Sequence, residues 1–109
     1  MYAISIYVPS TYAVDKTLTP AQYAVRVARV QKWVASQFGG FTATQGVGGW
    51  QASTGELVVE RVTIVTTFTT DSNAHETFCD KAQSYAKAWG QDAVTVTVAP
   101  LKYTFVTAA

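Results

Sequence analysis

The sequence predicts an α+β fold, with two helices on one face of an antiparallel sheet, and three observations lead to this prediction. Several segments alternate apolar and polar residues with period two, which is typical of strands. Two other segments carry apolar residues at helical spacing behind capping residues. The chain of 109 residues is long enough to bury one core, so we expect a single domain spanning residues 1–109.

Four segments are expected to form strands, and they cover residues 2–8, 41–53, 57–69 and 94–98. A loop is expected over residues 9–18. A turn at Thr54 and Gly55 makes a hairpin of the second and third strands. Glycines weaken the second strand, whereas the third has the strongest strand pattern. Pro100 breaks the fourth strand, and residues 103–106 are a candidate continuation of it.

Capping residues define the starts of both helices. Thr19 can cap the first helix, Pro20 fits its first position, and Gln22 stands where a capping box has Glu or Gln. Asn73, with Glu76 three residues later, begins the second. Each helix carries an apolar stripe and ends at glycine. The first helix has the stripe Tyr23, Val27, Val30 and Val34 and ends at Gly39–Gly40. The second has the stripe Ala74, Phe78, Ala82, Tyr85 and Trp89 and ends at Gly90.

The element order is therefore β-α-β-β-α-β, and its simplest packing is ferredoxin-like. Residues of one parity are assigned to the helix-covered core: Ile4, Ile6, Val8, Val62, Ile64, Phe68, Val94, Val96 and Val98. The opposite parity gives a semi-polar second face of Ser5, Tyr7, Arg61, Thr63, Val65, Thr67, Thr95 and Thr97. Burying that face in a trimer would also remove exposed strand edges.

The low charge of the chain excludes several partner classes. Only 14% of residues are charged and the net charge is +1, which gives no electrostatic basis for nucleic-acid binding. No segment approaches the ~20 apolar residues of a membrane span, and the N-terminus lacks the basic region of a signal peptide. We therefore expect a cytoplasmic protein without membrane contact. Because so few residues are charged, there is little polar material to cover a monomer, and we expect part of the surface to be buried between subunits.

Glu60 is the most informative candidate residue. It shares its parity with Val58, Val62 and Ile64, so the pattern places a carboxylate on the core side of the central hairpin. A buried carboxylate is costly unless it is paired, lies near the strand mouth or serves a function. The alternative is a strand-end glutamate that reaches solvent or pairs with a lysine.

Trp50 follows Gly48 and Gly49, where the backbone is bare and the indole could stack on an adenine or a sugar. Packing under a loop is the commoner fate of such a tryptophan. Because Trp50 and Glu60 flank the predicted hairpin turn, we expect them to lie close to cross-strand pairing.

Two further groups receive structural interpretations. His75 and Cys79 are four residues apart on the second helix, but two ligands make a weak metal site, and no metal or other cofactor is expected. Arg26, Arg29 and Lys32 are interpreted as a solvated basic stripe opposite the apolar face of the first helix.

Several short motifs together resemble known sequences. They are Gly39-Gly40, Gly49-Trp50, Gly55, Glu60-Arg61 and Trp89-Gly90-Gln91-Asp92-Ala93-Val94. The chain resembles a family of short bacterial proteins of unknown function, and it is similar to the small phage-encoded S-adenosylmethionine lyases. In those lyases a glutamate on the central strand precedes a basic residue and alternating valines. They carry a tyrosine where this chain has Trp50.

The lyase resemblance implies a PII-like homotrimer with active sites between subunits. It implies conversion of S-adenosylmethionine to 5′-methylthioadenosine and homoserine lactone, with Glu60 as the catalytic residue. For such a ligand we expect Trp50, Gly49 and Tyr7 to be the substrate-binding residues. Two other functions stay open. One is a non-catalytic PII-like trimer that binds a nucleotide-like ligand, and the other is a structural assembly subunit. The enzyme and the binder both require an apolar cleft that holds Glu60, whereas a structural subunit requires only an exposed strand end.

Overall fold

The computed structural model describes residues 1–12, 16–51 and 53–108. In chain order the elements are β1 (Tyr2–Pro9), β2 (Thr11–Tyr12), β3 (Lys16–Thr17), α1 (Pro20–Phe38), β4 (Thr42–Gln51), β5 (Leu57–Thr69), α2 (Ala74–Trp89) and β6 (Val96–Pro100). The expected boundaries agree closely with these, apart from the predicted loop and the two ends of the last strand. Residues 13–15 of that loop and Ala52 of the second predicted strand lie outside the described residues.

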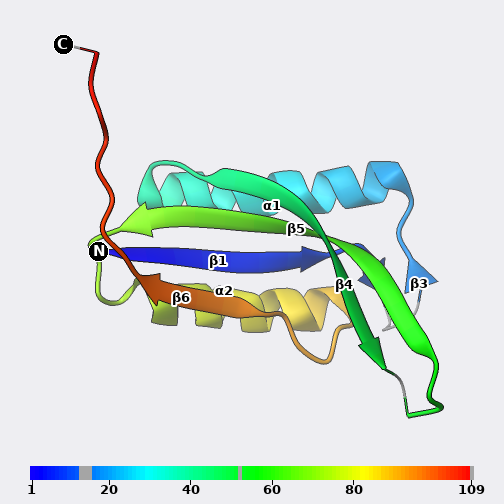
Figure 1. Cartoon of the computed structure of the whole chain (residues 1–109). Coiled ribbons are helices and arrows are strands. Elements are labelled where there is room, and N and C mark those ends of the chain that lie inside the picture. The colour runs from blue at the N-terminus through cyan, green and yellow to red at the C-terminus, as the bar shows by residue number, and fades with distance from the viewer. Residues whose placement is uncertain (13–15, 52, 109) are drawn as a thin grey trace.

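The main sheet has four antiparallel strands in the order β4-β5-β1-β6. Both helices lie behind it on one face, and the other face, hereafter the open face, points toward the viewer in Figure 1. The predicted α+β, ferredoxin-like arrangement is therefore confirmed. Within the predicted loop, β2 and β3 form a separate two-stranded sheet.

Helix α1 begins with the predicted capping box. The backbone N–H of Gln22 donates to Thr19 Oγ1 at 3.2 Å, and Gln22 Oε1 accepts from the Thr19 N–H at 3.0 Å. Pro20 occupies the first turn, and Gly39 ends the helix in the left-handed conformation with φ 89°. The local sequence thus sets both ends of α1.

Helix α2 starts where predicted, but by a different device. The Asn73 side chain makes no capping hydrogen bond, and its backbone is helical. Instead, Asp71 Oδ1 accepts from the Asn73 N–H at 2.8 Å, so an Asx-type turn leads into the helix. Gly90 ends the helix with φ 64°. Among the described residues, no helix is long and apolar enough to span a membrane.

The core lies between the sheet and the two helices. Its fully buried members include Ile4, Ile6 and Val8 of β1, Val30 and Val34 of α1, and Phe78 of α2. The predicted apolar stripes of both helices lie in or against this core. Phe78 packs against Trp33 and Phe38, each at a ring-centroid distance of 5.3 Å, so an aromatic cluster joins α1 to α2.

The predicted parity of β5 is wrong. Ile6 pairs with Val65 and Val8 with Thr63, so Thr63, Val65 and Thr67 face the helices, while Val62, Ile64 and Phe68 lie on the open face. The buried threonines are hydrogen-bonded. Thr63 Oγ1 lies 2.6 Å from the Tyr23 hydroxyl, and Thr67 Oγ1 donates to the Gly40 carbonyl at 3.0 Å. These hydrogen bonds offset the cost of removing the two hydroxyls from water.

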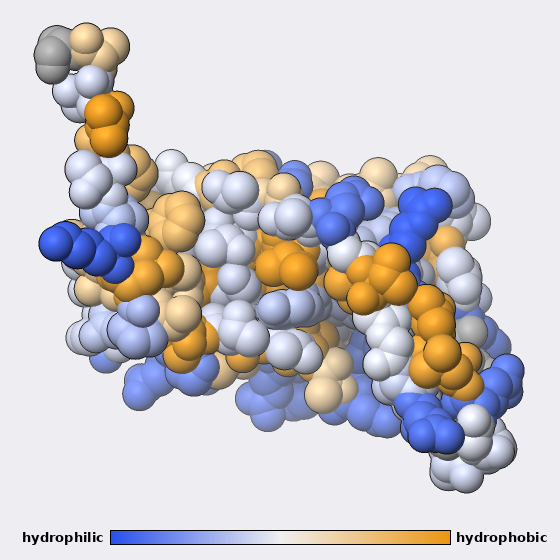
Figure 2. Space-filling model, viewed as in Figure 1, coloured by the Kyte–Doolittle hydropathy of each residue, from blue (hydrophilic) through white to orange (hydrophobic). Residues whose placement is uncertain are grey.

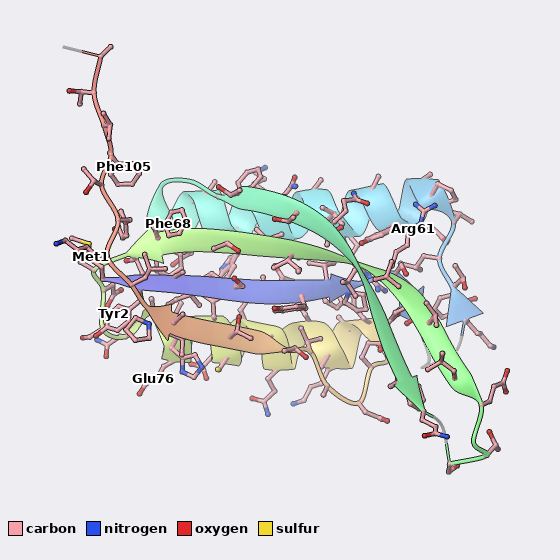
Figure 3. All side chains as sticks on the ribbon, viewed as in Figure 1. Met1, Tyr2, Arg61, Phe68, Glu76 and Phe105 are labelled. Carbon is pink, nitrogen blue, oxygen red and sulfur yellow. The ribbon has the colours of Figure 1, made fainter. Side chains whose placement is uncertain are left out.

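Arg61 follows the corrected parity and lies beside the start of α1 (Figure 3). The assignments for the other strands agree with the structure, since Val96 and Val98 pair with Ile6 and Ile4 on the helix side. The predicted continuation at residues 103–106 is not a strand. Instead, the chain after β6 leads away from the sheet (Figure 1), with Tyr103 against Phe68 at a ring-centroid distance of 5.2 Å.

Candidate functional site

A pocket of about 310 Å³ lies on the open face and is the strongest candidate site. Its walls come from the end of β1, the glycine-rich stretch of β4, the facing part of β5, and the connection from α2 to β6. It is lined by Tyr7, Pro9, Gly46–Trp50, Glu60, Val62, Ile64, Gln91 and Ala93–Thr95. Figure 2 views this face, where hydrophobic residues lie among neutral ones and also follow the β4–β5 hairpin.

Glu60 lies in this pocket, on the face opposite to the predicted one. Its partner in the strand register is Gly48, which has no side chain to cover the carboxylate. Glu60 is half-buried, and its Oε2 accepts a hydrogen bond of 2.7 Å from the Thr11 hydroxyl. The predicted core-side position of Glu60 is therefore wrong, although Glu60 is a half-buried carboxylate that lines a pocket.

The three predicted substrate-binding residues all line the same pocket. Trp50 pairs with Val58, two positions from Glu60 along β5, so the expected proximity across the hairpin is confirmed. The indole is 44% exposed and available as a wall. Tyr7 lies on β1, and Gly49 contributes backbone.

The structure adds Arg26 to the surroundings of the candidate site, although the sequence pattern predicts that Arg26 lies in a solvated basic stripe. Arg26 is only 8% exposed, whereas Arg29 and Lys32 are exposed as predicted. Its Nη1 donates to the backbone carbonyls of Pro9 and Thr11, both at 2.7 Å. The missed signal is its spacing, because position 26 is three residues after Tyr23 and therefore on the buried side of α1.

Two further contacts define the environment of the Arg26 guanidinium. Its Cζ lies 4.6 Å from the ring centroid of Trp89. Burial lowers the pKa of Arg26 from its usual value, while electrostatic attraction to Glu60 and Tyr23 acts in the opposite direction. The nearby Glu60 carboxylate therefore favours the charged form of the buried Arg26 guanidinium.

Gln91 connects the motif at the end of α2 to this group. Its Nε2 donates to the Thr11 carbonyl at 2.8 Å and lies 3.3 Å from Thr11 Oγ1. Thr11 itself is buried. Three distant parts of the chain thus meet at Thr11, beside the candidate carboxylate.

His75 and Cys79 adjoin each other, with Sγ 3.5 Å from Nε2. Within residues 1–12, 16–51 and 53–108, no group of three or more His, Cys, Asp or Glu side chains is arranged to hold a metal ion. The two side chains form a local hydrogen-bonded pair on α2.

Comparison with known proteins gives a family and a fold neighbour. The model of a family described as "Protein of unknown function (DUF3574)" matches residues 10–105. A solved phage SAM lyase in complex with S-methyl-5′-thioadenosine is similar in structure, with a TM-score of 0.58 and 19% sequence identity. The match covers 90% of this chain and 79% of the other. No curated protein matches the sequence.

Proposed function

This chain belongs to the DUF3574 family of proteins of unknown function, and we propose that it is an S-adenosylmethionine lyase whose catalytic residue is Glu60. The single observation that carries the proposal is the half-buried Glu60 carboxylate in a pocket shared with Trp50 and Tyr7. The fold neighbour supports it, because that phage SAM lyase binds S-methyl-5′-thioadenosine.

The proposed reaction is internal to the substrate. One oxygen of the substrate carboxylate attacks its own γ-carbon, and the bond between that carbon and the sulfonium sulfur breaks. The bonding pair returns to sulfur, giving neutral 5′-methylthioadenosine, and the new carbon–oxygen bond closes homoserine lactone. The step consumes no water and transfers no proton, so the protein needs to fold the methionine chain and stabilise its charges.

The pocket residues fit these tasks. The Glu60 carboxylate faces the cationic part of the substrate, where an anion in a partly desolvated site attracts a sulfonium or ammonium group. Trp50 stacks on the adenine, and Tyr7 and the backbone at Gly49 border the ligand. An acidic side chain among apolar walls suits a ligand with one aromatic and one cationic end.

A homotrimer with sites at the subunit boundaries completes the proposal. The corrected parity puts Val62, Ile64 and Phe68 on the open face, which makes that face more apolar than the sequence analysis expected. Such a face is better covered by other subunits than by water. Light scattering in dilute buffer should give about three times the chain mass of 11.8 kDa, and a clean monomer would contradict the inter-subunit site.

The decisive experiment incubates the purified protein with S-adenosylmethionine and separates the products by chromatography. We expect 5′-methylthioadenosine and homoserine lactone to accumulate in equal amounts. Binding without turnover, measured by calorimetry, would instead favour the nucleotide-binding trimer. Neither binding nor turnover would favour a structural subunit, although the half-buried position of Glu60 in a pocket already argues against that alternative.

A further inference from the structure

Arg26 and Thr11 form a support behind the proposed catalytic carboxylate. From their contacts we infer that Arg26 is a positioning residue, which holds the Pro9–Thr11 backbone so that the Thr11 hydroxyl fixes Glu60 in one orientation. This inference rests on the proposed function for its catalytic consequence. Its structural part concerns the chain alone.

The first step is the hold of Arg26 on the backbone. Nη1 of a guanidinium carries two protons, and the two hydrogen bonds to Pro9 and Thr11 use both of them. The face of Trp89 lies against the guanidinium and restrains its plane. Because the arginine is planar and buried, it ties the end of β1 and the start of β2 to both helices.

The second step is the direction of the Thr11 proton. A threonine hydroxyl has one proton to donate. The Gln91 amide N–H approaches Thr11 Oγ1 at 3.3 Å as a donor, so the hydroxyl acts as acceptor on that side. Its own proton is then available for Glu60 Oε2 at 2.7 Å. The carboxylate is thereby fixed through one of its oxygens before any substrate arrives, which is the preorganisation that a charge-stabilising residue requires.

Threonine variants test the second step. Thr11→Val keeps the side-chain volume and the backbone carbonyl but removes the hydroxyl, and we expect kcat for 5′-methylthioadenosine formation to fall about 10- to 100-fold. Thr11→Ser restores the hydroxyl and should recover most of that loss. The matched control is Thr67→Val, which removes another buried threonine hydroxyl, one that donates to the Gly40 carbonyl far from the pocket, and should leave kcat within about twofold.

Arginine variants test the first step with a readout that does not depend on catalysis. The Leu18 N–H donates to the Ser10 carbonyl at 2.9 Å, so its hydrogen exchange reports on the segment that Arg26 holds. Arg26→Met should accelerate this exchange at least about tenfold while amides in the centre of β1 stay protected. Arg26→Lys keeps the charge but not the planar fork, and should behave like Arg26→Met. Thr11→Val should leave Leu18 protected.

The outcomes separate the two proposals. If the wild-type protein forms no 5′-methylthioadenosine, the lyase proposal fails, yet faster Leu18 exchange in Arg26→Met still supports the hold on the backbone. Unchanged Leu18 exchange in Arg26→Met overturns the inference even if the enzyme is active. In an active enzyme, a wild-type kcat in Thr11→Val, or a loss in Thr11→Val that Thr11→Ser does not reverse, overturns it as well.

Discussion

The two halves of β5 lie in different surroundings, although they form one continuous strand. From Thr63 to Thr67 its inward residues are buried under the helices, and β5 pairs with β1 throughout this stretch and with β4 up to Thr66. From Leu57 to Glu60 it pairs with β4 alone, and this hairpin extends beyond the helices (Figure 1). Leu57 and Val59 remain 67% and 57% exposed.

Under the proposed function, stability and ligand binding depend on separate stretches of the same strand. The buried half closes the core, and the projecting half supplies Glu60 and, through its pairing with β4, places Trp50 and Gly48. Substitutions at the core should therefore change the free energy of unfolding, and substitutions on the hairpin should change function. Four substitutions test this separation, and they follow in order of decreasing expected effect.

Phe78→Ala should have the largest effect, and on stability. Phe78 is fully buried between Trp33 and Phe38, so truncation leaves a cavity and should lower the free energy of unfolding by about 3–5 kcal/mol. Urea titration measures this loss. Activity per folded molecule should stay near that of the wild type, and a proportionate fall in that activity would show that the two regions are coupled.

Glu60→Gln should have the opposite profile. The amide oxygen can still accept from Thr11, so the melting temperature should fall only slightly, through the lost attraction to Arg26, while loss of the negative charge should reduce kcat about 100-fold. Thermal melting and product chromatography on one preparation give both numbers. A structural charge pair would instead cost about 3–5 kcal/mol when broken, so a large stability loss with unchanged activity per folded molecule refutes the catalytic role.

Trp50 tests the aromatic wall. Trp50→Ala should raise the Kd for 5′-methylthioadenosine about 10- to 100-fold, because base–aromatic stacking contributes about 1–3 kcal/mol. Trp50→Phe retains a stacking surface and should weaken binding only modestly. Calorimetry compares the two variants. If both bind the ligand equally well, the indole is a packing residue.

Gly48→Ala should have the smallest effect. A methyl group there would lie 3.6 Å from Val62 Cγ1, an ordinary contact, so the fold should accept it. The methyl group narrows the pocket opposite Glu60 and should weaken 5′-methylthioadenosine by about 1 kcal/mol. Gly40→Ala is the control, since a Cβ there meets nothing within 4 Å. Equal affinity of both variants would place the ligand away from β4.

Local chemistry in the sequence was sufficient to predict most of the fold. The capping box at Thr19, the terminal glycines and the bounds of β5 all follow from neighbours in the chain. The parity of β5 does not follow from its local sequence, because both faces of the strand carry β-branched residues. Val62 and Ile64 on one face compete with Thr63 and Val65 on the other, and only their partners decide between them.

The part of the candidate site whose residues lie close together in the sequence was also predictable. Glu60 and Trp50 stand on one hairpin, so their proximity follows from the position of a single turn. The support for Glu60 required tertiary information, because Thr11 and Gln91 are 80 residues apart in sequence and Arg26 lies on another element. The local signal of this support was Arg26, a charged residue among the apolar residues on the buried side of α1.

The buried threonines of β5 also discriminate between alternative strand registers. A slip by one residue would place Val62 and Ile64 under the helices, at little cost in hydrophobic burial. It would also remove the Thr63 hydroxyl from Tyr23 and the Thr67 hydroxyl from the Gly40 carbonyl, so two hydrogen bonds of the native register would be lost. These two hydrogen bonds thus favour the native alignment, and the native alignment places Glu60 on the open face.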